Sequence, residues 1–227
     1  MSNLNPKPKS KSTEFIDPTF LFRFEVEIRK EKLEWTSKGL KLPESCRLPS
    51  FGALGGRKVF ADVRIGWSEE GIGVHVLVNG KRQLPWCRDT RLDESDGFHL
   101  WLDTRCSPNI HRATQYCHRF LFMPAGGGPR RERPVASLIE INRARGNPKP
   151  IGPDALLIKT FARHDGYELC GLIPASAMTG FDPSDQSRLA FYYAVIDREL
   201  GWQTLGVGPE YPVTEDPSMW AEVVLAQ

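Results

Sequence analysis

One short stretch of the 227-residue chain concentrates side chains that suit the binding of a ring-shaped polar molecule. Trp86 stands between Pro85 and Cys87, and Arg88 and Asp89 follow directly. A flat indole face packs against C–H groups, while a guanidinium and a carboxylate hydrogen-bond to hydroxyl groups. A tryptophan in a loop also commonly folds over one end of a hydrophobic core. The residues alone leave both interpretations of Trp86 open.

Two further aromatic residues are candidates for a second ring opposite Trp86. Trp202 and Tyr211 lie in a predicted long loop, residues 198–218. A fold that brings this loop to residues 80–96 would let one of these rings enclose a ligand together with Trp86. The alternative is that both rings pack within their own loop.

The loop that carries Trp86 is also rich in carboxylates. It contains four acidic residues within eight positions, namely Asp89, Asp93, Glu94 and Asp96. Hard oxygen ligands at this density are typical of a calcium site. Because Arg88 and Arg91 stand among them, a solvated loop of mixed charge explains the same residues equally well.

Two histidines form the next group of reactive side chains. His99 and His118 fall on predicted neighbouring strands, and Asp103 lies on the same strand face as His99. If the two imidazoles faced each other, they would bind a metal or transfer protons. The alternative is a pair of ordinary hydrogen-bonded histidines within a sheet. No nucleophile motif of a known hydrolase accompanies them.

The elements that must position these residues are strands. Alternation of apolar and polar residues predicts a strand at 20–28, and a hairpin formed by 59–67 and 72–78. The same criteria predict seven further strands, at 97–103, 116–123, 134–141, 155–163, 167–173, 188–197 and 220–225. One helical turn is expected at 174–181. Glycine and proline make up 38 of 227 residues, above the roughly 12% that is usual, and favour many short elements. The prediction is an all-β sandwich of two antiparallel sheets with at most short helical turns.

Charge and hydropathy restrict the partners of this sandwich. The net charge is +2, and three lysines lie within residues 1–13, a segment that we expect to form a disordered basic tail. The remaining chain is nearly neutral, which disfavours nucleic acid and anionic membranes as partners. No apolar run approaches the roughly 20 residues of a membrane span, and no signal peptide is visible, which favours a cytoplasmic protein. Residues 14–227 are expected to form a single domain.

Four segments in order resemble the family 9 carbohydrate-binding modules and related DOMON-like domains. They are ADVRIGWSEEGIGVHVLVNG with PWCRDTRLDESDGFHLWLD, GYELCGLIPASAMTG, LAFYYAVIDRELGW and DPSMWAEVVL, within residues 59–103 and 155–225. The resemblance implies a jelly-roll-like β-sandwich that binds a glycan between aromatic rings without catalysis, often with structural calcium. Trp86 aligns with the first ring of the family's sugar site. His99 stands where the family has an acid, and the second ring falls near Thr214.

The sequence therefore predicts a non-catalytic carbohydrate-binding module. The expected ligand-binding residues are Trp86, Arg88, Asp89, Trp202 and Tyr211. The alternative is an interaction or structural protein that keeps this fold but has lost the sugar site, with a protein as its partner. A third possibility is an enzyme that uses His99, His118 and Asp103.

Overall fold

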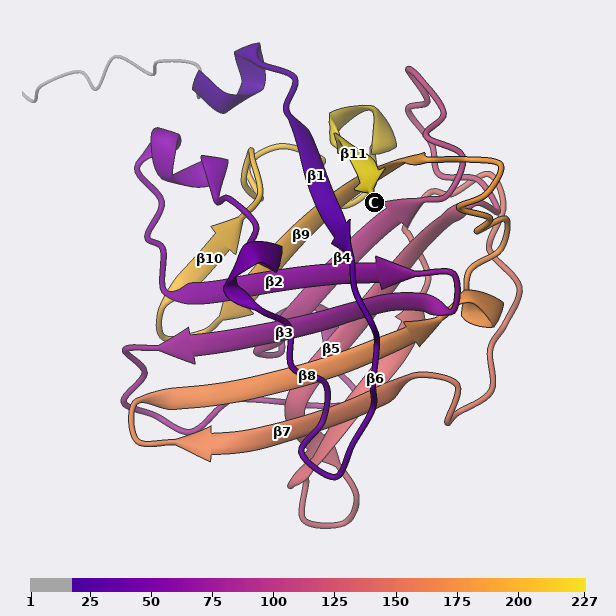
Figure 1. The fold of residues 1–227 in the computed structure, drawn as a ribbon. Helices are drawn as coiled ribbons and strands as arrows, with labels where there is room; N and C mark the ends of the chain where they lie inside the picture. The colour runs from indigo at the N-terminus through magenta and orange to yellow at the C-terminus, as the bar shows by residue number, and fades with distance from the viewer. Residues whose placement is uncertain (1–17) are drawn as a thin grey trace, which may run out of the picture.

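The structure is a computed structural model that describes residues 18–227, so the predicted tail at 1–13 lies outside the described residues. Within that range the chain forms eleven strands and six short 3-10 turns, η1 to η6, which confirms the all-β prediction (Figure 1). None of the helical turns in this range is long and apolar enough to cross a membrane. The expected turn at 174–181 is present as η5, Ala175–Ala177.

The strands lie close to the predicted positions. Their bounds are β1 Glu25–Lys30, β2 Ala61–Ser68, β3 Gly71–Asn79, β4 Gly97–Asp103, β5 Cys117–Gly127, β6 Arg133–Ile139, β7 Leu157–Arg163, β8 Gly166–Pro174, β9 Arg188–Asp197, β10 Gly201–Thr204 and β11 Ala221–Ala226.

The short strand β10 was not predicted. It pairs with the end of β9 and holds the buried Gln203, whose side chain accepts hydrogen bonds from two backbone N–H groups before and at the start of β2.

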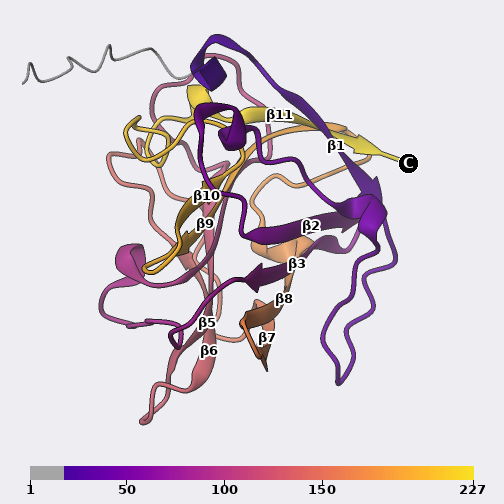
Figure 2. The same ribbon diagram turned by 90° about the vertical axis from the view of Figure 1, so that its left-hand side faces the viewer.

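The strands form two layers that face each other (Figure 2). One layer has the order β2-β3-β8-β7, and the other has the order β6-β5-β4-β9-β11, with β10 beside β9. All pairs within each layer are antiparallel. Strand β1 joins the layers because it pairs in parallel with both β11 and β2. The sandwich is therefore hydrogen-bonded continuously along one side, a feature that the alternation pattern does not reveal.

The hydrophobic core fills the space between the two layers. Apolar residues of the predicted strands are buried in it, among them Val26, Val74, Val76, Leu100, Leu102, Phe191 and Val195. The layers pack tightly at Gly171 of β8, where an added Cβ would lie 2.6 Å from Phe122 of the opposite layer and 2.7 Å from Val74 of the neighbouring strand. Only glycine fits at this position without moving the core.

The prediction for the first strand was wrong at its N-terminal end. The alternation begins at Phe20, yet β1 begins at Glu25, and Pro18–Leu21 form the turn η1. Glu25 pairs with Glu222, next to the first residue of β11, so the chain before Glu25 has no strand to pair with. Phe22 is consequently 61% exposed, and Phe24 is half-buried, with its ring stacked on Phe51.

A segment that we name the strap, residues 31–47, crosses the outer face of β2, β3 and β8 (Figure 1). It packs so closely that a Cβ at Gly73 would lie 2.4 Å from Leu40 and 2.8 Å from Leu33. A small second core forms beneath it, made of Leu33, Leu40, Leu42, Cys46 and Cys170. The outer face of this layer is thus covered rather than exposed to solvent.

Candidate functional site

Trp86 lies in the loop between β3 and β4 and is half-buried. Two guanidinium groups lie near its ring: the Cζ atom of Arg88 is 5.1 Å from the ring centroid and that of Arg198 is 4.5 Å away. Such cation–π contacts occupy ring surface that a ligand would otherwise use. Asp89 beside them is exposed. A ligand that stacks on Trp86 therefore has to use an uncovered part of the ring or displace an arginine.

A buried ionic cluster holds the ends of this loop. The Lys81 Nζ atom lies 2.9 Å from Asp96 Oδ2 and 2.9 Å from Asp197 Oδ2, and all three side chains are at most 2% exposed. Asp96 also accepts hydrogen bonds from the backbone N–H groups of Trp86 and Arg198. Burial raises the pKa of Asp96. Burial opposes the charge of Lys81, but its hydrogen bonds to Asp197 and Asp96 outweigh this effect and raise its pKa.

The four acidic residues predicted for calcium face different partners. Asp96 is bound to Lys81, Asp93 pairs with Arg119, and Glu94 lies 3.4 Å from Arg91. Asp96, Asp93 and Glu94 thus belong to three separate ion pairs, each with a different basic residue. Within residues 18–227, the acidic loop contains no group of three metal-type ligand atoms that all lie within 4.8 Å of one another.

The strand register divides the predicted ligand-binding residues between two ends of the molecule. Trp202 of β10 pairs with Ile196, which pairs with Gly97 at the start of β4, so it lies toward the Trp86 end. Tyr211 instead stacks on Phe20, with ring centroids 5.0 Å apart. The structure therefore does not bring Tyr211 to Trp86.

A groove of about 380 Å³ opens at the end where Tyr211 lies, and we name it the N-terminal groove. Its floor is Ala190 and Tyr192 of β9, and the chain after Asp103 of β4 forms one side. Its other apolar lining comes mainly from Phe20, Phe22, Phe24, Met219 and Trp220. Its polar lining includes Arg23, Glu25, Ser107, Asn109, Ser218 and Glu222. Such a mixture in a concave surface of this size is typical of small-ligand sites.

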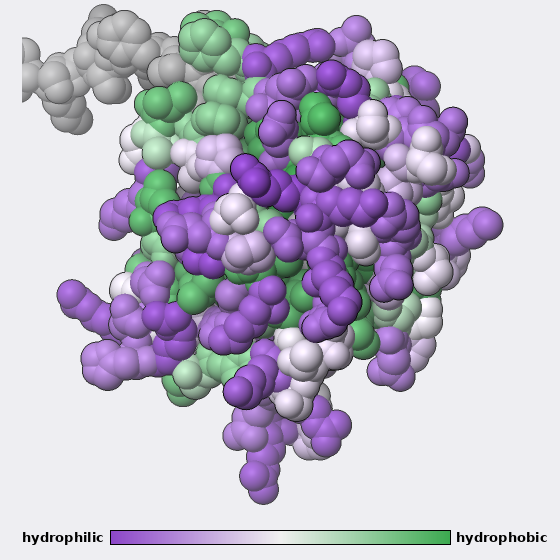
Figure 3. Space-filling model, in the orientation of Figure 1, coloured by the Kyte–Doolittle hydropathy of each residue, from purple (hydrophilic) through white to green (hydrophobic). Residues whose placement is uncertain are grey.

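The groove and the Trp86 loop lie at opposite ends of β4. This strand has seven residues, which span about 20 Å at the usual rise of an extended chain. Phe20 and Phe22 are 51% and 61% exposed, so their rings are more accessible than the half-buried Trp86. Figure 3 shows apolar surface gathered over η1, at the upper edge beside the start of the described chain.

Of the two interpretations of His99 and His118, the structure favours ordinary buried histidines over a facing pair. His118 pairs with Leu102, whereas His99 is three residues away on β4, so the two imidazoles lie on opposite faces of the sheet. His118 accepts a hydrogen bond from the Thr179 backbone N–H at 2.8 Å, and burial lowers its pKa to about 4. His99 is fully buried against Arg119, and burial lowers its pKa well below the usual range. The pair therefore cannot serve as a joint proton-transfer or metal site.

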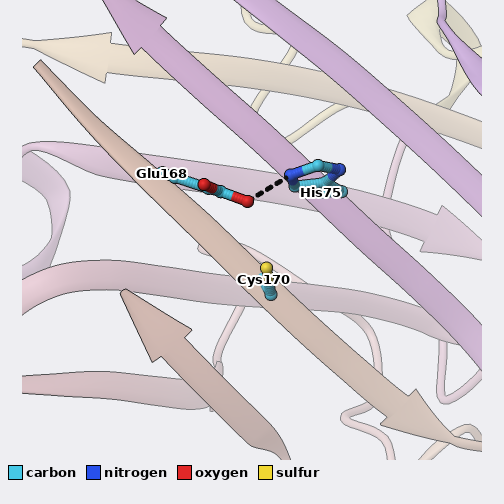
Figure 4. Close-up of side chains that lie close together, drawn as sticks. All are labelled: His75, Glu168 and Cys170. Carbon is cyan, nitrogen blue, oxygen red and sulfur yellow. Dashed lines mark hydrogen bonds and ion pairs between the residues drawn. The ribbon is translucent and has the colours of Figure 1, made fainter. Parts of the chain in front are cut away.

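Sequence reasoning missed one group of potential metal ligands. His75 of β3 and Glu168 and Cys170 of β8 each offer one ligand atom, and these atoms all lie within 4.8 Å of one another (Figure 4). The alternate positions of Glu168 and Cys170 place both side chains on one strand face, which is a visible signal in the sequence. His75 joins these two residues only through the register between β3 and β8, and nothing in the sequence around His75 indicates this pairing.

The fold is similar to that of solved carbohydrate-binding modules. Similar solved structures include a family 9 carbohydrate-binding module from Caldicellulosiruptor kristjanssonii in complex with cellotriose, at 11% identity and a TM-score of 0.58 over 89% of this chain and 94% of that chain. The same kind of module in complex with glucose matches at 10% identity and a TM-score of 0.59 over 90% of this chain and 97% of that chain. No family model and no curated protein matches the sequence. At these identities the likeness shows the fold.

Proposed function

We propose that this protein is a non-catalytic module that binds a saccharide, with the N-terminal groove as its principal site. The observation that carries the proposal is the lining of the groove, where exposed aromatic rings stand beside hydrogen-bonding side chains. Rings bind the apolar face of a sugar, and side chains such as Asn109 and Glu222 suit its hydroxyl groups. The fold of modules solved with glucose and cellotriose supports this assignment.

The expected affinity follows from the number of ring faces. Burial and stacking on one aromatic face contribute about 1–3 kcal/mol. Phe20 and Phe22 offer two exposed rings, and the hydrogen bonds at the rim add selectivity more than free energy. We therefore expect a dissociation constant between about 1 mM and some tens of micromolar, or about −4 to −6 kcal/mol.

The Trp86 loop is a second proposed contact surface for a saccharide. Trp86, Arg88, Asp89 and Trp202 lie toward the same end, whereas Tyr211 contributes to the groove end through its contact with Phe20. Stacking on Trp86 competes with the contact from Arg198. A calcium ion held by exposed Asp89 and its neighbours remains a proposal for this loop, and measurements with added calcium or with a chelator test it.

The experiment is a glycan-array screen followed by isothermal titration calorimetry, with glucose and cellotriose as the first probes. The variant Phe22→Ala removes an exposed ring of the groove, and Trp86→Ala removes the ring of the other end. The matched control is Val59→Ala, because Val59 is 52% exposed and lies in neither the groove nor the Trp86 loop. Each protein is measured with calcium and with a chelator.

The proposal expects saccharide binding that Phe22→Ala weakens at least tenfold and Val59→Ala leaves unchanged. Binding that only Trp86→Ala weakens would move the site to the Trp86 loop. Absence of binding to every saccharide at millimolar concentration would refute the function itself.

A protein-binding role is the second candidate, and one observation favours it. Phe20, Leu21 and Phe22 are consecutive and between 51% and 67% exposed. A contiguous apolar patch on a protein surface often marks a contact with another protein. If the wild type self-associates in light scattering and Phe22→Ala is monomeric, this role gains support over sugar binding.

A further inference from the structure

The cluster of His75, Glu168 and Cys170 lies on the outer face of the layer β2-β3-β8-β7, far from the surfaces considered for saccharide. His75 pairs directly with Cys170 across β3 and β8, and Glu168 is the next residue on the same face of β8. The His75 Nε2 atom lies 2.8 Å from Glu168 Oε1 (Figure 4). Cys170 projects from the same strand beside them. Three different ligand types thus converge from two adjacent strands.

The strap encloses this cluster from above. Gly39 is in the left-handed region at φ +75°, and a Cβ there would lie 3.1 Å from the Cys170 Sγ atom. Burial raises the pKa of the Cys170 thiol to about 11, and the hydrogen bond from the Leu40 backbone N–H to its sulfur opposes that rise. Cys170 is 0% exposed and His75 is 5% exposed, while the Glu168 side chain is 17% exposed. The cluster is therefore dry, with Glu168 at its accessible edge.

The hydrogen bond between His75 and Glu168 leaves part of the cluster unsatisfied. The Nδ1 atom of His75 is buried and has no hydrogen-bond partner within the described residues. Because His99 and His118 also each have one unpaired ring nitrogen, the evidence for a ligand is the convergence of three ligand types rather than this atom. A simple structural ion pair also gives no role to the thiol placed beside it.

We propose that His75, Glu168 and Cys170 form a binding site for a divalent cation of borderline softness, with Zn²⁺ as the preferred ion. Zinc binds imidazole nitrogen, thiolate sulfur and carboxylate oxygen in tetrahedral sites, and three protein ligands leave the fourth position to water. Its bond lengths correspond to ligand separations of about 3.3–3.7 Å, the longer ones being those to sulfur. The three atoms within 4.8 Å reach that geometry if Cys170 moves inward and the His75–Glu168 pair opens slightly.

The charges balance in the bound state. The Cys170 thiol loses its proton to solvent, so a thiolate and a carboxylate neutralise the charge of the ion, and the neutral imidazole completes the set. Two cations lie on neighbouring strands, and both have other partners. The Lys159 Nζ atom bonds to the backbone carbonyls of Thr36 and Ser37 in the strap, and Arg64 pairs with Asp62. Both side chains therefore bond to groups other than the three proposed ligand atoms.

The experiment titrates the reduced, chelator-treated full chain with Co²⁺, which reports its ligands by absorption. The expected result is one equivalent of bound Co²⁺ with visible bands of a tetrahedral ion and a sulfur-to-cobalt charge-transfer band. Cys170→Ser removes the charge-transfer band, and Glu168→Gln weakens binding at least tenfold. The matched control is Cys46→Ser, because Cys46 lies buried in the same small core but outside the ligand group.

A thermal measurement provides an independent readout. Zn²⁺ at a hundredfold excess over its dissociation constant should raise the melting temperature of the wild type by roughly 5–11 °C, and leave that of His75→Gln unchanged. The proposal is overturned if the wild type shows no charge-transfer band, or if Cys170→Ser keeps it. It is equally overturned if Zn²⁺ stabilises the wild type and His75→Gln alike.

Discussion

The ionic cluster beneath the Trp86 loop leads to a quantitative prediction. Lys81→Met keeps the length of the side chain but removes the only cation within reach of Asp96 and Asp197 among the described residues. Both carboxylates are then buried without a counter-charge. Breaking a buried ion pair by removing one partner costs about 3–5 kcal/mol. For a chain of this size, that corresponds to a fall in melting temperature of roughly 6–20 °C.

The loss must depend on pH, and its sign follows from the carboxylates. Burial already raises the pKa of Asp96, and without Lys81 nothing with a positive charge opposes that rise above the unfolded value of about 3.9. An acid with a raised folded pKa stabilises the folded state below the unfolded pKa and loses that contribution as pH rises through the folded pKa. The deficit of Lys81→Met is therefore largest at neutral pH and shrinks toward pH 5.

The assay is urea unfolding of wild type and variant at pH 7 and pH 5. Lys32→Met is the control, since Lys32 is exposed and pairs with Glu34 at the surface, and its stability should match that of the wild type. Adding Asp197→Asn to Lys81→Met should recover part of the loss, because one buried charge disappears. A loss below 1 kcal/mol at pH 7, or one that is equal at both pH values, would refute this reasoning.

Three further predictions concern packing and the thiols. Trp86→Ala should destabilise the fold by about 2 kcal/mol in urea unfolding, near half the cost of a fully buried aromatic, and a neutral result would mean that the ring packs on nothing. Gly171→Ala should cost about 1–3 kcal/mol in the same assay, since its Cβ meets Phe122 and Val74; wild-type stability would show that the layers adjust freely. Thiol titration at pH 8 should find that the folded protein reacts slowly, because burial raises the pKa of even Cys106 to about 11. Cys106 should react first, because it is half-buried and the other four cysteines are buried. Five thiols should react in denaturant, and rapid reaction of the folded chain would contradict the described burial.

The strands were predictable where a short apolar run is bounded by turn residues. The predicted strands at 97–103 and 188–197 coincide with β4 and β9, which are buried along almost their whole length. The alternation from Phe20 to Phe24 was misleading because a strand also requires a partner, and β11 does not extend that far. Strand β10 has only four residues, too few for a periodic signal.

The sequence could not predict those contacts at the functional surfaces that join residues far apart in the chain. The sequence places Trp86 beside Arg88, but the contact from Arg198 comes from a residue more than one hundred positions away. His75 and Glu168 are separated by 93 positions and meet only through the register of β3 and β8. Local patterns therefore identify which side chains are available, and the pairing of distant strands decides which of them meet.

The most direct test of saccharide binding is a titration followed by amide chemical shifts. The full chain, labelled with ¹⁵N, is titrated with cellotriose and with the best saccharide from the array. Our account predicts progressive, saturable shifts that concentrate at residues 20–25 and 218–222, which line the N-terminal groove. Saturable shifts confined to residues 80–96 would place the site at the Trp86 loop instead. A spectrum that stays unchanged at millimolar saccharide would contradict the central claim.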